Sequence, residues 1–410
     1  MTMMSDLSED LVEEILCRVS ITSLGAVRST CKGWYVLSKT RVLCKAETKH
    51  QFLGFMKKNY KLCSMRFDLH GNCNEEGGEE FMNPSIKKSG NLLDQLDICK
   101  VFQCDGLLLC VTKEENTRLV VWNPYSGQIR WIKCNNSYHR YEGYAIGYDN
   151  NRKHKILRFS DMSFSTYKIY DFISNSWRVL DIAPNWHINP DQRGASLKGN
   201  TYFFAREKRE DEEDEEDEDI LWQPVEYLLC FDFTTENFGQ LHPLPFEQYI
   251  DDAGALSSFG EEKLAALFQS FASSVVEIWV TSMIEANAVS WIPFLKVDMK
   301  PHCSFRFRLP FDGGSFFIDE EKKVAVVIHV DVVAESEMNR YEDVAYIIGE
   351  NGYVKKVCLV EAVNQGGSLN LSKRSCCNYP HVCCSSYVPS LAQINQSVGF
   401  ENEREEEEAN

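Results

Sequence analysis

A repeated turn signature constrains the fold of this chain more than any other feature of its sequence. In WNPYSGQI, YDFISNSW and FDFTTENF an aromatic residue precedes Asn or Asp, Ser or Thr follows three residues later, and a bulky apolar residue lies three beyond that. The three sets are Trp122, Asn123, Ser126, Ile129; Tyr170, Asp171, Ser174, Trp177; and Phe231, Asp232, Thr235, Phe238. An Asx side chain that accepts a hydrogen bond from the backbone two residues on turns the chain. Each set therefore predicts a hairpin corner.

The spacing of the corners predicts the architecture. The aromatic residues fall at 122, 170, 231 and, in VEIWVT, at Trp279, so the intervals are 48, 61 and 48 residues. Removing an insertion from Glu207 to Asp219 brings the long interval back to 48. A repeat near 50 residues with several strands per unit is typical of kelch-like β-propellers. The same regularity predicts that the acidic run 207–219 is a loop between strands.

Short apolar or alternating runs between turn residues predict antiparallel strands throughout this region. The runs are CDGLLLCV, RLVVWNP, YAIGYDN, KHKILRF, YKIYDF, SWRVLDI, NTYFFA and YLLCFDF. After Trp279 the repeat loses its register. FFIDEEKKVAVVIHV and VAYIIGENGYVKKVCL still predict strands, with Asn351 and Gly352 as a hairpin turn. The number of blades stays open.

The first forty residues carry a helical periodicity instead. Two stripes of apolar residues recur at helical spacing: Leu11, Val12, Ile15, Leu16, Val19; then Leu24, Val27, Cys31, Trp34, Leu37. Ser8 is a good N-cap, and Thr22 or Ser23 caps the second run. A segment this short buries too little surface to be stable alone, so we expect it to pack against another protein. The fold class is α+β multidomain: a small N-terminal helical domain followed by a mainly antiparallel β domain.

The order of residues in the helical segment resembles an F-box. The resemblance rests on Leu7, Glu9-Asp10-Leu11, Glu13-Glu14-Ile15-Leu16, Val19, Ser23-Leu24, Val27-Arg28, Cys31-Lys32 and Trp34. Ser8 and Ser20 stand where this family commonly has proline, which bears on affinity for the adaptor rather than on fold. An ordinary amphipathic hairpin packed on the chain's own sheet is the alternative, and the ordered match through Cys31 and Trp34 favours the F-box.

The β region resembles the F-box-associated interaction domain of many plant F-box proteins. The motifs occur in the expected order: CDGLLLC, LVVWNP, YKIYDF..SNSWRVLD, LLCFDF..ENFGQL, EIWVT and YVPSLAQI. The domains expected are an F-box at 1–45, a propeller-like domain at 46–398 and an acidic tail at 399–410.

The resemblance implies a function without catalysis by this chain. The F-box would dock on a Skp-type adaptor, and through it on a cullin and a RING subunit, while the β domain holds an unknown target protein for ubiquitination. Tethering raises the effective concentration of the target, so the receptor supplies proximity rather than a catalytic side chain. The residues expected to contribute to the adaptor contact or to the core beneath it are Leu7, Leu11, Ile15, Leu16, Val19, Leu24, Val27, Cys31 and Trp34.

Charge and composition argue against nucleic-acid binding, membrane insertion and secretion. The formal net charge is −18, but Glu210 to Asp219 is ten successive acids and residues 401–410 carry six acids and one arginine. Without these two runs the charge is about −3, so no basic patch indicates nucleic acid. No apolar run is long enough for a membrane span and no signal peptide precedes the helices. We expect an intracellular protein, nuclear or cytoplasmic, whose sixteen cysteines are thiols.

The most chemical-looking cluster is CCNYPHVCC, with Cys376, Cys377, His381, Cys383 and Cys384. Adjacent cysteines point to opposite faces of a strand and lack the spacing of a structural zinc site, so we predict neither metal nor cofactor. Two alternatives stay open: a kelch-like propeller with its own ligand or metal site, and an F-box protein that binds the adaptor without a role in degradation.

Overall fold

The computed structural model of the protein describes most of the chain between residues 8 and 394. The described residues are 8–19, 27, 30, 32–37, 51–58, 60–68, 72–73, 79–80, 85–88, 92–113, 118–134, 142–160, 166–190, 193–208, 225–248, 252–260, 262–300, 315–335, 338–359, 381–382 and 387–394. No helix among them is both long and apolar enough to cross a membrane.

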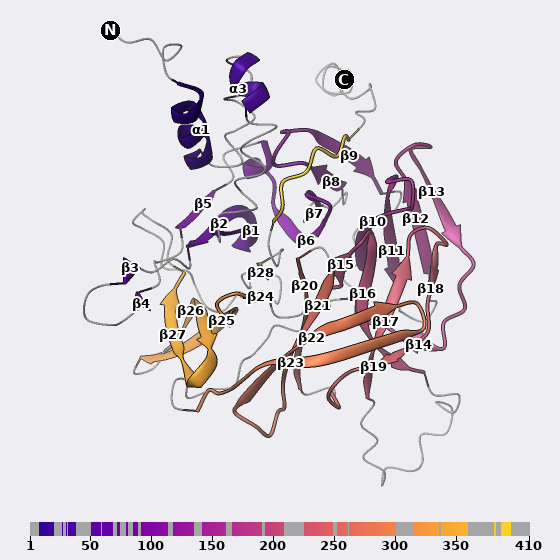
Figure 1. Ribbon diagram of the computed structural model, residues 1–410. Coiled ribbons are helices and arrows are strands. Elements are labelled where there is room, and N and C mark those ends of the chain that lie inside the picture. The colour runs from indigo at the N-terminus through magenta and orange to yellow at the C-terminus, as the bar shows by residue number, and fades with distance from the viewer. Residues whose placement is uncertain are drawn as a thin grey trace.

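Five consecutive stretches of chain each form one antiparallel sheet (Figure 1). The first sheet comprises β6 (Ile98–Cys104), β7 (Leu107–Thr112), β8 (Arg118–Trp122) and β9 (Ile129–Lys133). The second comprises β10 (Glu142–Tyr148), β11 (His154–Ser160), β12 (Thr166–Asp171) and β13 (Ser176–Leu180). The third comprises β14 (Trp186–His187), β15 (Ala195–Leu197), β16 (Asn200–Glu207), β17 (Glu226–Asp232), β18 (Asn237–Phe238) and β19 (His242–Pro243).

The fourth and fifth sheets repeat the same meander. The fourth comprises β20 (Ala253–Phe259), β21 (Lys263–Gln269), β22 (Val275–Glu285) and β23 (Ala288–Asp298). The fifth comprises β24 (Ser315–Asp319), β25 (Val324–Glu335), β26 (Met338–Gly349) and β27 (Val354–Cys358).

The two ends of the β region build a further sheet together. Its strand order is β28 (His381–Val382), β1 (Gln51–Lys58), β2 (Lys61–Asp68) and β5 (Ser85–Lys88). The short pair β3 (Asn72–Cys73) and β4 (Glu79–Glu80) lies between β2 and β5 in the chain, and η3 (Leu92–Gln95) leads into β6. Because β1 contacts β6 while β28 contacts β24, this sheet closes the ring between the fifth and first sheets.

A separate apolar core fills each junction between neighbouring sheets. Tyr144 and Ile156 of the second sheet pack with Leu109 and Val121 of the first, and equivalent clusters lie at the other junctions. The sheets therefore pack face to face around the ring, as in a β-propeller. The predicted fold class, a small helical domain followed by a propeller-like β domain, is confirmed.

The two faces of the ring differ in their connections because each sheet is an antiparallel meander. One face, which we call the short-turn face, carries the turns between first and second and between third and fourth strands. Many of these turns place a non-glycine residue at positive φ: Asp105, Arg152, Asn175, Lys198, Glu236, Lys323 and Asn351. The opposite face, the long-connection face, is where the described strands end before residues 135–141, 209–224, 249–251 and 301–314, which lie outside the described part.

The strand and turn predictions agree with the structure in most places. All the quoted runs form strands, and Asn351 lies in the 3₁₀ turn η4 (Glu350–Gly352) between β26 and β27. The acidic run joins the paired strands β16 and β17, but Glu207 belongs to β16 because it pairs with Trp186. The predicted loop 207–219 therefore begins too early. Residues 209–224 lie outside the described part.

Trp279 continues the spacing of the aromatic residues but does not mark a corner. Trp279 lies within β22, next to a register shift, and the turn comes only at residues 286–287. Val280 and Thr281 follow Trp279, so no Asx side chain is there to close a turn. The repeat identifies the third strand of the fourth sheet, but not its end.

Glycine at position 147 permits close packing of the second sheet on the third. A Cβ at Gly147 would lie 2.2 Å from Phe233 Cδ2 and 2.3 Å from the carbonyl oxygen of Gly199. We expect Gly147→Ala to destabilise the protein by about 1–3 kcal/mol, because the buried third-sheet groups must shift. Thermal unfolding measures the effect. Gly239→Ala is the matched control, since its Cβ would meet only Cys230 O at 3.8 Å, and an equal loss in both variants would contradict the packing argument.

Candidate functional site

The N-terminal helix α1 (Glu9–Arg18) begins where its sequence predicts and ends one residue before Val19, the last residue of the predicted stripe. Ser8 is the N-cap, and its side chain accepts a hydrogen bond from Leu11 N at 3.4 Å. Glu9 and Asp10 occupy the first turn, where negative charge favours the free N–H groups. At the other end Val19 is extended and its N–H donates to the Leu16 carbonyl. Helix α3 (Lys32–Leu37) follows in the chain and contacts α1.

The apolar stripe of α1 divides into two faces. Val12 and Leu16 are buried, with 5% and 1% of their surfaces exposed, and they pack against Tyr125. Leu11 and Ile15 remain 55% and 38% exposed. Neighbouring positions on an α-helix differ by about 100° in direction, so the two pairs face different ways. One pair packs against Tyr125 of the propeller, and the other leaves apolar surface exposed.

The structure places the predicted adaptor residues in three groups. Leu11 and Ile15 are exposed, Leu16 is buried, and Val19, Val27 and Trp34 are half-buried around Leu16 and Tyr125. Leu7, Leu24 and Cys31 lie outside the described residues. Burial makes Leu16 part of the chain's own core, whereas Leu11 and Ile15 are available for an intermolecular contact.

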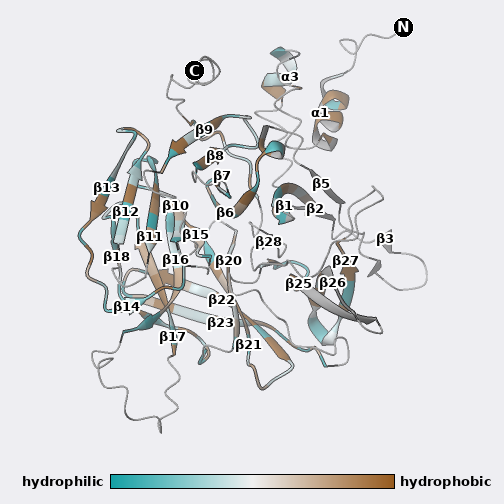
Figure 2. Ribbon diagram, turned by 180° about the vertical axis from the view of Figure 1, so that it is seen from behind, coloured by the Kyte–Doolittle hydropathy of each residue, from teal (hydrophilic) through white to brown (hydrophobic). Residues whose placement is uncertain are grey.

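Two further exposed apolar residues lie on α3, the helix that contacts α1, and neither belongs to the predicted stripe. Tyr35 and Val36 on α3 are 44% and 56% exposed. Figure 2 shows α1 and α3 side by side at the end of the molecule where β9 lies. The spacing of apolar residues alone could not have indicated Tyr35 and Val36, because both lie off the helical stripe. We call Leu11, Ile15, Tyr35 and Val36 the exposed helical surface.

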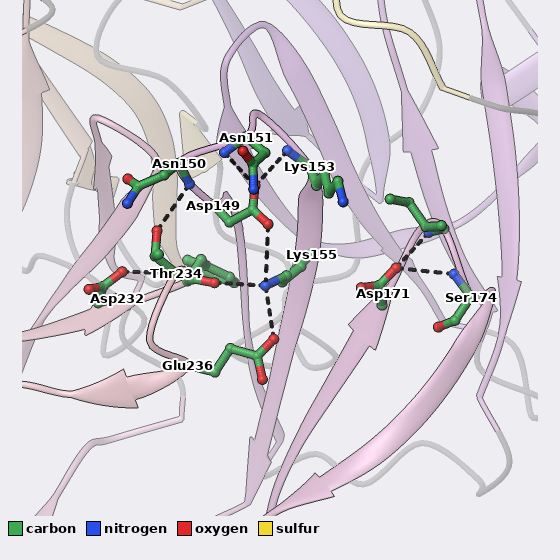
Figure 3. Close-up of polar contacts among 12 residues, drawn as sticks. Asp149, Asn150, Asn151, Lys153, Lys155, Asp171, Ser174, Asp232, Thr234 and Glu236 are labelled. Atoms are coloured by element: carbon green, nitrogen blue, oxygen red, sulfur yellow. Dashed lines mark hydrogen bonds and ion pairs between the residues drawn. The ribbon is translucent and has the colours of Figure 1, made fainter.

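The corner carboxylates of the propeller have structural roles (Figure 3). Asp171 Oδ1 accepts hydrogen bonds from Ile173 N at 2.6 Å and Ser174 N at 3.1 Å. Asp232 Oδ1 accepts one from Thr234 N at 2.7 Å. Both residues cap their own turns, as predicted from the repeat. Their geometry gives no indication of paired general acid and base groups.

A buried lysine lies beside these corners, at the junction of the second and third sheets (Figure 3). Lys155 Nζ donates to Phe233 O at 2.9 Å and lies 2.8 Å from Glu236 Oε1 and 3.7 Å from Asp149 Oδ2. Desolvation opposes ionisation of Asp149, but N–H donors of Lys153 and Asn151, with the Lys155 ammonium, lower its pKa below the usual range. The ion pair between Lys155 of the second sheet and Glu236 of the third therefore links the two sheets.

Three thiols, of which Cys104 is buried and Cys134 and Cys230 are partly exposed, are desolvated enough to disfavour the thiolate. Burial raises the pKa of Cys104 and Cys230 to about 12 and that of Cys134 to about 11. A protonated thiol is a poor nucleophile and metal ligand. Over the described ranges no three His, Cys, Asp or Glu residues are grouped as a metal site would need. The four cysteines of the predicted cluster 376–384 lie outside those ranges.

Comparison with known proteins identifies both parts of the chain. Residues 4–45 match the F-box domain and residues 53–394 match the F-box associated beta propeller domain. The chain is similar to an F-box protein of Arabidopsis thaliana, with 98% identity over 410 residues and all of both chains covered. A second relative from the same plant is 64% identical over 418 residues, covering 99% of this chain and all of its own.

A third relative from Arabidopsis thaliana is described as an F-box/kelch-repeat protein. It is 48% identical over 405 residues, which cover 96% of this chain and 97% of the relative. The two matched regions coincide with the helical segment and the ring of sheets. Such domains are typical of non-catalytic adaptor and receptor proteins.

Proposed function

The chain belongs to the F-box proteins that carry an F-box associated β-propeller domain, and from this premise we propose that it is the substrate receptor of an SCF-type ubiquitin ligase. Its F-box docks on a Skp-type adaptor, which links it to a cullin and a RING subunit. Its propeller binds the protein to be ubiquitinated. The observation that carries the proposal is the exposed helical surface, which stands out because the other F-box apolar residues whose side chains the structure describes are buried or half-buried.

The exposed helical surface suits an adaptor because it is apolar and held by a packed helix. Leu11 and Ile15 lie one turn apart on α1, so their side chains stand next to one another. Val12 and Leu16 anchor the same helix from its other side. An apolar pair on a pre-ordered helix loses little entropy on binding, which favours a helix-in-groove contact.

We place the target protein on the long-connection face. The short-turn face consists of tight turns braced between sheets by ion pairs such as Arg152 with Asp105 and Lys263 with Glu320. The F-box packs at a turn of that face, at residues 123–128. Longer connections on a rigid scaffold are where binding specificity usually resides. This arrangement directs the target away from the adaptor side of the propeller.

The proposed role needs no catalytic group of this chain. A receptor accelerates ubiquitin transfer by raising the effective concentration of the target lysines near the conjugating enzyme. The capped corner carboxylates and protonated thiols agree with such a role. An intracellular location, in the nucleus or the cytoplasm, is part of the proposal. A non-degradative F-box protein would make the same adaptor contact.

Co-expression with a Skp-type adaptor tests the proposal. We expect a stable one-to-one complex on size exclusion with light scattering, and recruitment of cullin and RING subunits on their addition. A chain that stays free of adaptor at micromolar concentrations would refute the receptor role. A complex that binds adaptor but excludes the cullin would favour the non-degradative alternative.

A further inference from the structure

Tyr125 is the only propeller residue in the apolar cluster of the F-box helices, within the described part of the chain. Its side chain is fully buried among Val12 and Leu16, with Val19, Val27, Trp34 and Leu37 around them. A surface turn of an isolated propeller would expose a tyrosine at this position. Its complete burial means that the helical cluster closes over it.

The turn that carries Tyr125 is fixed from within the first sheet. Asn123 Oδ1 accepts hydrogen bonds from Tyr125 N at 2.9 Å and Ser126 N at 3.0 Å. Asn123 is itself fully buried, and its N–H donates to Gln128 O at 2.9 Å. The corner that the sequence repeat predicts therefore holds the backbone of Tyr125 in one conformation.

The C-terminal segment 387–394 braces the same turn from outside. Asn123 Nδ2 donates to Ser390 O and to Ala392 O, each at 3.0 Å. Gln128 Oε1 accepts from Ile394 N at 3.0 Å. The segment is anchored in turn by Tyr387, whose hydroxyl donates to Gly106 O at 3.1 Å. Three parts of the chain thus meet at one turn: the F-box, the first sheet and the C-terminal segment.

From this geometry we infer that Tyr125 completes the core of the F-box and joins it to the propeller as one rigid body. Tyr125 is a positioning residue, because its side chain is fully buried against Val12 and Leu16 and can act on a partner only through α1. A rigid joint fixes the direction in which the long-connection face points relative to the adaptor. Its importance for ubiquitin transfer rests on the proposed function, but the joint itself does not.

Distance measurements on the full chain test the joint without any adaptor. Spin labels introduced as non-canonical amino acids at the exposed positions Tyr35 and Val179 report the separation of F-box and propeller. We expect one narrow distance distribution in the otherwise unaltered protein and a broad one with Tyr125→Ala. A broad distribution before Tyr125 is changed would overturn the inference.

Hydrogen exchange provides a second readout that separates local release from unfolding. In Tyr125→Ala the α1 amides should exchange at least about tenfold faster, because a large aromatic is lost from a small core, while β10–β13 keep their protection. Tyr125→Phe retains the ring and loses only the hydroxyl, so the exchange of its α1 amides should stay closer to that of the unaltered chain than to that of Tyr125→Ala. Tyr353→Ala, at the partly exposed end of another third-to-fourth turn, is the matched control. Unchanged exchange of α1 in Tyr125→Ala would also overturn the inference.

Variants on the helical side distinguish this inference from the proposed function. Ile15→Asp alters the exposed face of α1 and should leave the distance distribution narrow. If the distribution stays narrow and no adaptor binds even the unaltered chain, the proposed function fails and the joint stands. If adaptor binds but the distribution is broad, the joint fails and the proposed function stands.

Discussion

Ile15→Asp is expected to weaken adaptor binding by at least about thirtyfold, the effect of losing a central interface residue. The substitution replaces an exposed apolar side chain on α1 by a carboxylate that would be desolvated in the complex without a counter-charge. The free chain should fold normally, since Ile15 is 38% exposed and lies outside the Tyr125 cluster. Calorimetric titration with a Skp-type adaptor measures the change.

Two further variants test whether the effect belongs to this surface. Leu11→Asp lies one turn away on the same exposed face and should act in the same direction. Val179→Asp introduces the same charge at a 67% exposed apolar residue of β13 and should bind as the unaltered chain does. Equal affinity for Ile15→Asp and Val179→Asp would place the adaptor contact elsewhere.

The strands of the propeller could be predicted from the sequence where an Asn or Asp side chain closes the turn at the end of a strand. Asn123, Asp171 and Asp232 each close their own turn, so the four-residue signature predicts a corner without knowledge of distant contacts. At Trp279 the aromatic persists without an Asx neighbour, and the strand runs on through a register shift. Closure of the ring by β28 and β1 joins residues more than 300 apart, which no local pattern indicates.

The sequence predicted the candidate site only as one stripe of apolar residues, without separating the buried residues from the exposed ones. Periodicity showed that Leu11, Ile15 and Leu16 share one side of a helix, but not which of them faces solvent. The division depends on Tyr125, more than a hundred residues further along the chain. Tyr125 lies between the conspicuous residues of a repeat unit, and nothing in its local sequence distinguishes it from an ordinary turn residue.

Lys155→Met is expected to destabilise the propeller by about 3 kcal/mol, the low end of the cost of breaking a buried ion pair. Methionine keeps most of the apolar stem but leaves the Phe233 carbonyl without this donor. It also leaves Glu236 and Asp149, which are 16% and 12% exposed, without a shared cation. Glu236 retains its ion pair with Arg178, and Asp149 its backbone donors, so the loss stays below that of an isolated buried charge.

Urea unfolding of Lys155→Met and Lys153→Met separates this junction from a general effect of removing positive charge. Lys153 is exposed two residues earlier in the chain, and its backbone N–H, rather than its ammonium group, donates to Asp149. Its replacement should change the free energy of unfolding by less than about 0.5 kcal/mol, as for most surface substitutions. Equal stability of the two variants would mean that the desolvation of Lys155 cancels its attraction to both carboxylates. The second and third sheets would then be held together by the packing of Phe231, Phe233 and their apolar neighbours alone.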